Sequence, residues 1–365
     1  MGRCPQGCQG SLSVPLDEAL GIAAHQRSSD ELVRLGCLLS VLMPYELARW
    51  ILEQWSGVQV SASTLWHWVE QTGRTAQAEV LTQLHSAAIA PESLAEGIAA
   101  LPLAIGADGV MVPMRPVPKT ATGKIQWREV KVGVLARLGE RVKRSGETVS
   151  RLMQRRLVAV LGDIDAFIPQ LQQEAQRQSF KSAPRLIWLS DGGRGFWRVY
   201  QQCFADCAIG ILDFFHAAGH LWRATVALFE HPRSAQASAW FKQWRHQLRQ
   251  GQHHTVLASL TYLINANLLK GKALRTLLQV QTYFQRHHAH IHYQRFEKQG
   301  FPLGSGMVES ACKWLIQQRF KGVGMRWSED GFNHLLVLRL AWANDRFEDL
   351  FPRVRDAKQK YSPIP

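Results

Sequence analysis

Two aspartates in this 365-residue sequence each precede glycine at the end of an apolar run: Asp108 in GADG and Asp191 in SDGG. An Asp-Gly pair is a common turn signal, so either residue taken alone is explained by a turn. A carboxylate at the end of a buried strand, however, is costly unless it is paired or coordinated to a metal. Two of them in one α/β core therefore favour a metal site.

A third acid, Glu309, lies just inside an apolar helix start in FPLGSGMVESACKWLIQQRF (301–320). If Ser305 caps this helix, the capping-box position is Val308, so Glu309 is not the reciprocal cap. A favourable interaction with the helix dipole is the other explanation. The small and apolar neighbours of Glu309 predict a buried helix start, packed closely on the sheet through its GSG sequence. A buried glutamate needs a partner, and the hard ions Mg²⁺ or Mn²⁺ suit three carboxylates.

Converging carboxylates in a basic protein suit two-metal phosphoryl transfer. One ion activates an attacking water or 3′-hydroxyl, and the other stabilises the leaving oxygen. The chain carries 43 Lys and Arg against 29 Asp and Glu, giving a net charge of +14, which favours a polyanionic partner. Nucleic acid is the partner that this charge predicts, with an affinity that falls as salt rises.

The cysteine spacing and the hydropathy of the chain indicate its redox state and its cellular location. The six cysteines have irregular spacings in a chain long enough to build a core, so we expect reduced thiols. Cys4 and Cys8 look like half of a zinc site, but no second pair follows nearby, and zinc binding there stays open. With no apolar run of about 18 residues and no signal-like N-terminus, we expect a cytoplasmic protein.

We expect a short Cys-containing N-terminal segment (1–13, the stub) followed by a helical DNA-binding domain at 14–98. Within it, 45–57 and 58–74 read as two helices joined by a short Gly turn, which is typical of a helix-turn-helix. An ordinary helical hairpin is the alternative. If the second helix enters a major groove, the residues facing the bases are expected to be Ser61, Ser63, Thr64 and His67.

The remaining chain predicts a mixed α/β sheet with a helical insertion. Within residues 99–216, the first part of this core, three β-rich runs, LAIGADGVMVPMR, WREVKVGVLARL and RRLVAVLG, imply an antiparallel meander. Helices then alternate with the strands RLIWLSDGG and AIGILDFFH up to residue 216. Residues 217–300 read as helical throughout, the core resumes over 301–350, and 351–365 form a tail.

The order of these motifs resembles the DDE transposases of bacterial insertion sequences, in particular the Kra-type group related to Mutator-like elements. GADG, SDGG, LDFFHAAGHLW and the motif at 301–320 followed by GMRW carry the resemblance, which covers most of the chain to about 350. It implies an RNase H-like catalytic core interrupted by an all-helical insertion, with Asp108, Asp191 and Glu309 as the metal-binding triad.

The same resemblance implies two Mg²⁺ or Mn²⁺ ions, transposon terminal inverted repeats and target DNA as double-stranded partners, and homodimers or larger homo-oligomers in the bacterial nucleoid. The reaction would expose 3′-hydroxyls that attack target phosphodiesters. Basic and aromatic residues on and after the Glu309 helix are expected to grip the DNA ends: Lys313, Arg319, Lys321, Arg326 and Trp327.

Family members also carry a Cys- or Asp-x-x-His motif after the second acid, and Asp213 to His216 match it in the Asp form. Asp213 is therefore an alternative second metal ligand. We prefer Asp191, because it follows the strand expected to lie beside the first one. His216 and His220 share a helical face and would brace the site, contact DNA or belong to the core.

Two rival functions remain. His290 and His292 flank Ile291 and are followed by Tyr293, as in single-strand DNA nucleases that use a tyrosine nucleophile. That chemistry needs the histidines on a strand, whereas this segment reads as helix. The other rival is a non-catalytic DNA-binding protein derived from a transposase.

Overall fold

The computed structural model describes residues 27–85, 89–116, 125–146, 148–266, 269–352 and 354. The predicted stub with Cys4 and Cys8, and most of the predicted tail, lie outside these residues. In the part of the chain that is described, no helix is both long and apolar enough to cross a membrane.

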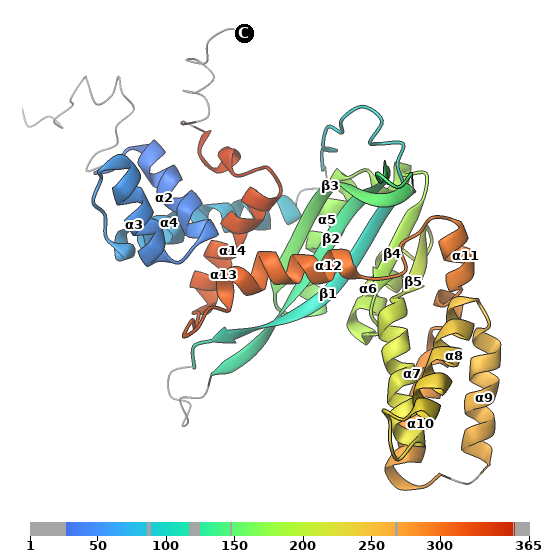
Figure 1. The fold of residues 1–365 in the computed structure, drawn as a ribbon. Coiled ribbons are helices and arrows are strands. Elements are labelled where there is room, and N and C mark those ends of the chain that lie inside the picture. Colours follow the sequence, from blue (N-terminus) through green and yellow to red (C-terminus); the bar gives the residue numbers. More distant parts are fainter. Residues whose placement is uncertain are drawn as a thin grey trace, which may run out of the picture.

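The fold is mixed α/β, built on a five-stranded sheet of order β3-β2-β1-β4-β5 (Figure 1). The first three strands form the predicted antiparallel meander, and β4 and β5 run parallel to β1. The strands are β1 (Leu103–Met114), β2 (Gln126–Val142), β3 (Thr148–Leu161), β4 (Leu186–Ser190) and β5 (Ala208–Leu212). Residues 103–107 of β1 are buried without alternation, as expected of a strand covered on both faces.

Helices cover both faces of the sheet and contribute to two hydrophobic cores. On one face lie α5 (Ile164–Arg177) and α6 (Arg194–Cys203), whose buried apolar residues join one core. The other face is crossed by one long helix, which begins as α12 (Gly306–Ala311), continues as a π-helical stretch (Cys312–Gln317) and ends as α13 (Gln318–Phe320) (Figure 1).

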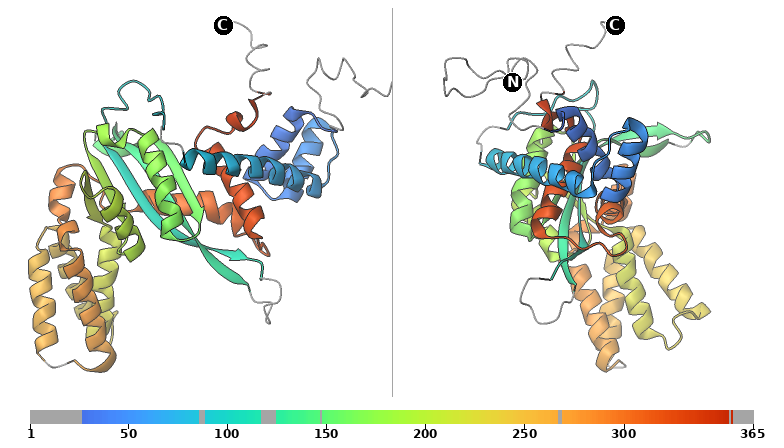
Figure 2. Two further views of the ribbon diagram at one scale, coloured as in Figure 1. Left: turned by 180° about the vertical axis from the view of Figure 1, so that it is seen from behind. Right: turned by 90° about the vertical axis from the view of Figure 1, so that its left-hand side faces the viewer.

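In its described residues, the predicted insertion consists of helices joined by short loops, and it extends from the β4–β5 end of the sheet (Figures 1 and 2). Its first helix starts earlier than predicted. The strand AIGILDFFH ends at Leu212, because the Asp213 side chain accepts a hydrogen bond from the His216 amide and starts a helix at Phe214. The helices are α7 (Phe214–Leu228), α8 (Ala235–Arg249), α9 (His253–Asn265), α10 (Gly271–Arg286) and α11 (Tyr293–Lys298).

The N-terminal helices pack on the C-terminal helix at the opposite end of the molecule from the insertion (Figures 1 and 2). A Cβ on Gly73 of α4 would lie 2.5 Å from the His334 carbonyl oxygen of α14, so the two helices cross in close contact. This region is therefore continuous with the core. The helices are α2 (Asp30–Leu42), α3 (Tyr45–Ser56), α4 (Ala62–Leu84) and α14 (Glu329–Ala343).

The outer edge of the sheet is closed by polar side chains. Asn344 pairs with the Leu157 backbone as a neighbouring strand would, accepting from its amide at 2.8 Å and donating to its carbonyl at 2.9 Å. Closure of this kind protects an edge strand from pairing with another chain.

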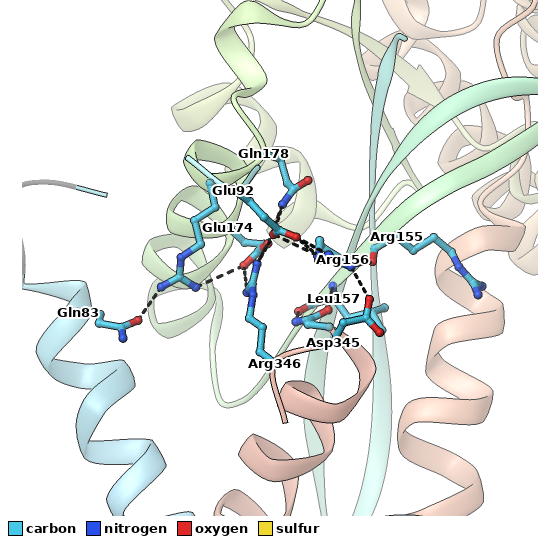
Figure 3. Close-up of polar contacts among 11 residues, drawn as sticks. Gln83, Glu92, Arg155, Arg156, Leu157, Glu174, Gln178, Asp345 and Arg346 are labelled. Carbon is cyan, nitrogen blue, oxygen red and sulfur yellow. Dashed lines mark hydrogen bonds and ion pairs between the residues drawn. The ribbon is translucent and has the colours of Figure 1, made fainter. Parts of the chain in front are cut away.

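An ion-pair network lies next to this edge (Figure 3). Glu92, in the segment that leads from α4 to β1, accepts hydrogen bonds from Arg156 of β3 and from Arg346 beyond α14. Arg346 also bonds Glu174 of α5, at 2.7 and 2.8 Å. Gln178 donates to Glu92 at 2.8 Å. The network therefore ties four separate segments of the chain together.

Candidate active site

The parallel pairing of β1 with β4 brings the first two predicted acids together. Ala107 is paired with Ser190, so the next residue along each strand direction is an aspartate, Asp108 or Asp191. Residues at matching positions of neighbouring strands share a face. Asp108 shares its face of β1 with Gly106, on which α12 lies, and Asp191 follows the end of the neighbouring strand.

Each of these carboxylates uses one oxygen locally. Asp108 Oδ1 accepts from the Gly109 amide at 2.7 Å, and Asp191 Oδ1 accepts from the Gly193 amide at 2.9 Å. Among the residues that the structure describes, the Oδ2 atoms accept no hydrogen bond. Both side chains are half-buried. Each aspartate therefore presents an oxygen that is available to a ligand.

Helix α12 brings Glu309 over the same face. A Cβ on Gly106 of β1 would lie 2.7 Å from Met307 Cε and 3.5 Å from Val308 Cβ, so the glycine permits the helix to lie directly on the strand. The expectation that the GSG sequence provides this contact with the sheet is wrong, because a Cβ on Gly304 would meet the Phe215 ring of α7, at 2.7 Å. Gly306 faces open space.

The helix that carries Glu309 changes its hydrogen-bonding pattern immediately afterwards. The π-helical stretch Cys312–Gln317 follows α12 without a break. Such π-bulges are rare and often occur at functional sites. The apolar pattern of 301–320 predicts the helix but contains no signal for this change.

Asp191 and Glu309 both act electrostatically on Asp108. Burial raises the pKa of Asp108, and the charges of Asp191 and Glu309 raise it further, against the lowering effects of the Gly109 amide and His216. The ionised acids therefore repel one another in a partly desolvated site. A bound cation would relieve both costs.

Asp213 is fully buried and its carboxylate is saturated with hydrogen bonds. Oδ1 accepts from the His216 amide at 2.8 Å, and Oδ2 accepts from the amide and the hydroxyl of Ser305, the latter at 2.6 Å. Burial raises its pKa, but the bonds from His216 and Ser305 outweigh this and hold the pKa at about 2. Asp213 thus joins the start of α7 to the start of α12.

His216 adds a positive charge beside the acids. Its hydrogen bond with Asp213, at 3.3 Å from Nδ1 to Oδ1, outweighs burial and raises the pKa of His216 to about 9. The imidazole is therefore protonated at neutral pH. Ser305 bridges Asp213 and Glu309. Its hydroxyl oxygen lies 2.6 Å from Asp213 Oδ2 and 3.1 Å from Glu309 Oε1. The sequence pattern treats Ser305 only as a helix cap and misses this bridging position.

A tighter group competes with the predicted triad. Within the described residues, one set of three brings potential ligand atoms within 4.8 Å of one another, and it consists of Asp213, His216 and Glu309. The triad of Asp108, Asp191 and Glu309 is wider. A two-ion site spans about 8 Å, from ion separations near 4 Å and Mg–O distances near 2 Å. A spacing wider than 4.8 Å therefore does not conflict with two ions. The carboxylate of Asp213 is saturated with hydrogen bonds, which makes the tighter group a poorer metal site.

The predicted DNA-gripping residues after Glu309 occupy three different environments. Lys313 and Arg326 are exposed, and Lys321 is half-buried with Nζ 5.3 Å from the Trp127 ring centroid. Trp327 is half-buried and donates its indole N–H to the Phe320 carbonyl at 2.9 Å, so it packs in the core.

Arg319 does not belong to an exposed surface, and the expectation that it contacts DNA is wrong for this conformation. It is 2 % exposed, and its Nε donates to the Ser40 carbonyl at 2.8 Å. That carbonyl belongs to the last turn of α2, where helical carbonyls lack partners within the helix. Arg319 thus holds α2 against the core, a role that its sequence position does not reveal.

The predicted helix-turn-helix consists of α3 and α4, with Gly57 at φ 70° after α3. Ser61 caps α4 and accepts from the Thr64 amide at 3.0 Å. Ser63 and His67 are exposed, while Thr64 is half-buried. The start of α4 therefore offers hydroxyls and an imidazole to solvent at the end of the molecule opposite to the insertion.

The geometry of a tyrosine-nucleophile nuclease is missing here. His290 ends a 3₁₀ turn, and His292 lies between that turn and α11, so neither histidine is on a strand. Tyr293 is 0 % exposed and cannot reach a phosphodiester in this conformation.

Comparisons with known proteins identify no family for this chain. No family model and no curated protein matches the chain. A solved structure described as a Drosophila P element transposase strand transfer complex is similar over 94% of this chain and 84% of the other, at 11% identity and a TM-score of 0.30. A similarity at that level supports no argument about fold or activity.

Proposed function

We propose that the chain is a DDE transposase that uses divalent metal ions to cleave the ends of an insertion sequence and to join them to target DNA. The observation that carries the proposal is the pairing of Ala107 with Ser190, which places Asp108 and Asp191 side by side under the helix of Glu309. The strand order supports an RNase H-like core, with the insertion entering between β5 and α12.

The residues present fit two Mg²⁺ or Mn²⁺ ions, because Asp108 and Asp191 each keep a carboxylate oxygen without a hydrogen-bond partner. Asp108, Asp191 and Glu309 would hold these ions. When bound, they would activate the attacking oxygen and stabilise the leaving one. The Gly109 and Gly193 amides each bond one oxygen of an aspartate, and the other oxygen stays available to a metal ion.

The roles of the neighbouring residues follow from their contacts. Asp213 fixes the start of α12 through Ser305 and so sets the position of Glu309. The imidazolium of His216 lowers the repulsion among the acids, and it would attract a phosphate of the DNA backbone. The residues proposed to bind a DNA end are the exposed Lys313 and Arg326 and the half-buried Lys321. Arg319 is excluded from this set, and Trp327 is assigned a packing role.

Double-stranded DNA is the proposed partner, and the start of α4 is the proposed reader of base edges. The charge of the chain supports this. Residues 217–300 alone carry eleven Lys and Arg against two acids, Glu230 and Glu297. We also propose action in the bacterial nucleoid as a homodimer or larger homo-oligomer. A non-catalytic DNA-binding protein is the second candidate, and intact acids at all three positions disfavour it.

The test is cleavage of a plasmid that carries the DNA flanking this gene on both sides, in Mg²⁺ or Mn²⁺. Asp108→Asn, Asp191→Asn and Glu309→Gln should each lower the cleavage rate about 10³-fold or more, because each removes several kcal/mol of transition-state stabilisation. Binding to the same DNA in EDTA should persist. Wild type that binds but never cleaves would favour the DNA-binding protein.

The same assay decides the second ligand. Asp213→Asn is expected to reduce cleavage together with thermal stability, because Asp213 holds two helix starts in place. If Asp213→Asn abolishes cleavage while Asp191→Asn leaves it unchanged, Asp213 is the ligand and the assignment to Asp191 is wrong.

A further inference from the structure

The loop that carries Asp191 is in direct contact with the helical insertion. Tyr283 of α10 lies on Gly192, the residue after Asp191. A Cβ on Gly192 would lie 2.0 Å from Tyr283 Cε2 and 2.7 Å from its Cζ. No side chain fits there without moving the ring. A residue of the insertion, about 90 positions further along the chain, therefore packs against the backbone that follows the second acid.

The same loop is also held by hydrogen bonds from the core. The Trp197 indole N–H of α6 donates to the Asp191 carbonyl at 2.6 Å, and the Gly193 amide donates to Asp191 Oδ1 at 2.9 Å. The Asp191 backbone thus has an anchor on α6, and Tyr283 packs on the residue that follows it.

Tyr283 is fixed by packing. The imidazole of His220, on α7, stacks on its ring with centroids 3.6 Å apart and planes at 12°. His287 lies against it at 5.1 Å between centroids. Among the described residues, the buried Tyr283 hydroxyl has no hydrogen-bond partner. The ring rather than the hydroxyl therefore carries the contact.

Electrostatics agree with this proximity. Burial raises the pKa of the Tyr283 phenol, and the charges of Asp191 and Asp213 raise it further. Burial also lowers the pKa of His220 to about 4, so a neutral imidazole stacks on the ring at neutral pH. Two neutral rings can pack beside an acidic site without adding a charge to it.

We infer that Tyr283 is a positioning residue for Asp191, and that the helical insertion is thereby part of the catalytic site. The inference rests on the proposed function, since it assumes that Asp191 binds metal. Removal of the Tyr283 ring would let the Gly192 backbone move. Asp191 would then bind metal more weakly, while the other acids stay in place.

The experiment is a Mn²⁺ titration of plasmid cleavage with full-length variants. Tyr283→Ala should raise the Mn²⁺ concentration for half-maximal cleavage about 10-fold, a typical effect of removing a residue that orients a metal ligand. At saturating Mn²⁺ its rate should return to near the wild-type value. Tyr283→Phe should behave as wild type, because the hydroxyl has no partner. Tyr262→Ala is the matched control, since Tyr262 lies on α9 of the same insertion and is 74% exposed.

Gly192→Ala gives an independent variant if Tyr283→Ala fails to fold. Its methyl group must displace the ring, so it should shift the Mn²⁺ midpoint in the same direction. In the Tyr283→Ala background the Gly192→Ala change should add little, because the atoms it would meet are absent. Purely additive effects of the two changes would overturn the inference, as would folded Tyr283→Ala or Gly192→Ala protein with a wild-type midpoint.

Asp191→Asn in the same titration separates the two levels of inference. If Asp191→Asn cleaves with a wild-type Mn²⁺ midpoint, Asp191 is not a ligand and the proposed function fails at that residue. If Asp191→Asn is inactive while Tyr283→Ala keeps the wild-type midpoint, only the positioning role of Tyr283 is overturned.

Discussion

Glu92 at the β3 edge and Asp108 on the α12 face are both half-buried carboxylates, yet their neighbours differ. Glu92 accepts hydrogen bonds from Arg156 and Arg346. Burial raises its pKa, but these guanidinium groups outweigh it and hold the pKa at about 2. Asp108 has no guanidinium partner among the described residues, and burial raises its pKa. A carboxylate that is paired with arginines ties segments of the chain together. A carboxylate that lies beside other acids without a cationic partner is instead suited to bind a metal ion.

The arginines show the same division. Arg319 is buried and bonds a backbone carbonyl of α2, while Arg326, seven residues later, is exposed. One supports the fold and the other is available to a phosphate backbone. Residue type alone does not distinguish the two roles in either pair, since the packing around each side chain sets them.

The largest predicted effect separates the two sets of acids by cleavage. Glu309→Gln should lower the plasmid cleavage rate about 10³-fold, roughly 4 kcal/mol. Glu92→Gln, which makes the same chemical change, should leave the rate per folded molecule unchanged. Rates are to be measured well below both melting temperatures. If the cleavage rate fell equally in the two variants, the proposed catalytic role of Glu309 would be contradicted.

The next effect separates the two arginines by stability. Arg319→Ala should lower the free energy of unfolding by about 3 kcal/mol, because a buried, bonded side chain is lost and the Ser40 carbonyl loses its partner. Arg326→Ala should leave stability unchanged and should reduce the slope of log affinity against log salt by about 1. Urea unfolding and DNA binding at several salt concentrations measure both. A stable Arg319→Ala protein with weakened DNA binding would restore Arg319 to the DNA-gripping set.

A smaller effect tests the Glu92 network through pH. Because the folded pKa of Glu92 is lowered from 4.5 to about 2, its contribution is complete above the unfolded pKa and disappears as the pH falls through the folded one. Discounted for partial exposure, it should be about 2 kcal/mol. The loss of wild-type stability between pH 4.5 and 2 should be correspondingly smaller in Glu92→Gln. Parallel pH curves for the two proteins would contradict the assignment.

The smallest predicted effect is a gain in stability, whereas Arg319→Ala and Glu92→Gln are expected to lose stability. In EDTA at neutral pH, Asp108→Asn should raise the free energy of unfolding by about 1 kcal/mol, because it removes a half-buried charge that Asp191 and Glu309 repel. Thermal or urea unfolding measures this, with Glu92→Gln as the destabilised counterpart. A destabilised Asp108→Asn protein would show that Asp108 is a structural carboxylate like Glu92.

The sequence predicts the sheet well because its signals are local. Apolar runs and the glycines after Asp108 and Asp191 identify β1 and β4, and the alternation of strands with helices predicts a mixed sheet. The N-terminal helices follow from apolar periodicity, and the helical insertion at 217–300 follows from its composition and its lack of a strand signal. The pairing of Ala107 with Ser190 depends on register across the sheet, which no local pattern contains.

Long-range contacts account for what the sequence does not reveal. The glycine that lets α12 approach the sheet is Gly106, whose strand position gives no hint of a helix above it. Arg319 is indistinguishable by type from Arg326, because its burial depends on where α2 packs. Tyr283 reads as one apolar position of an amphipathic helix. Its contact with Gly192 exists only because the insertion folds back on the loop after β4.

The most direct test of the central claim is the position of Mn²⁺ in crystals of the protein soaked with that ion, located by anomalous scattering. We predict Mn²⁺ peaks between Asp108, Asp191 and Glu309, bound through the carboxylate oxygens that lack hydrogen bonds. A single peak held by Asp213, His216 and Glu309, with Asp108 and Asp191 unliganded, would contradict the assignment.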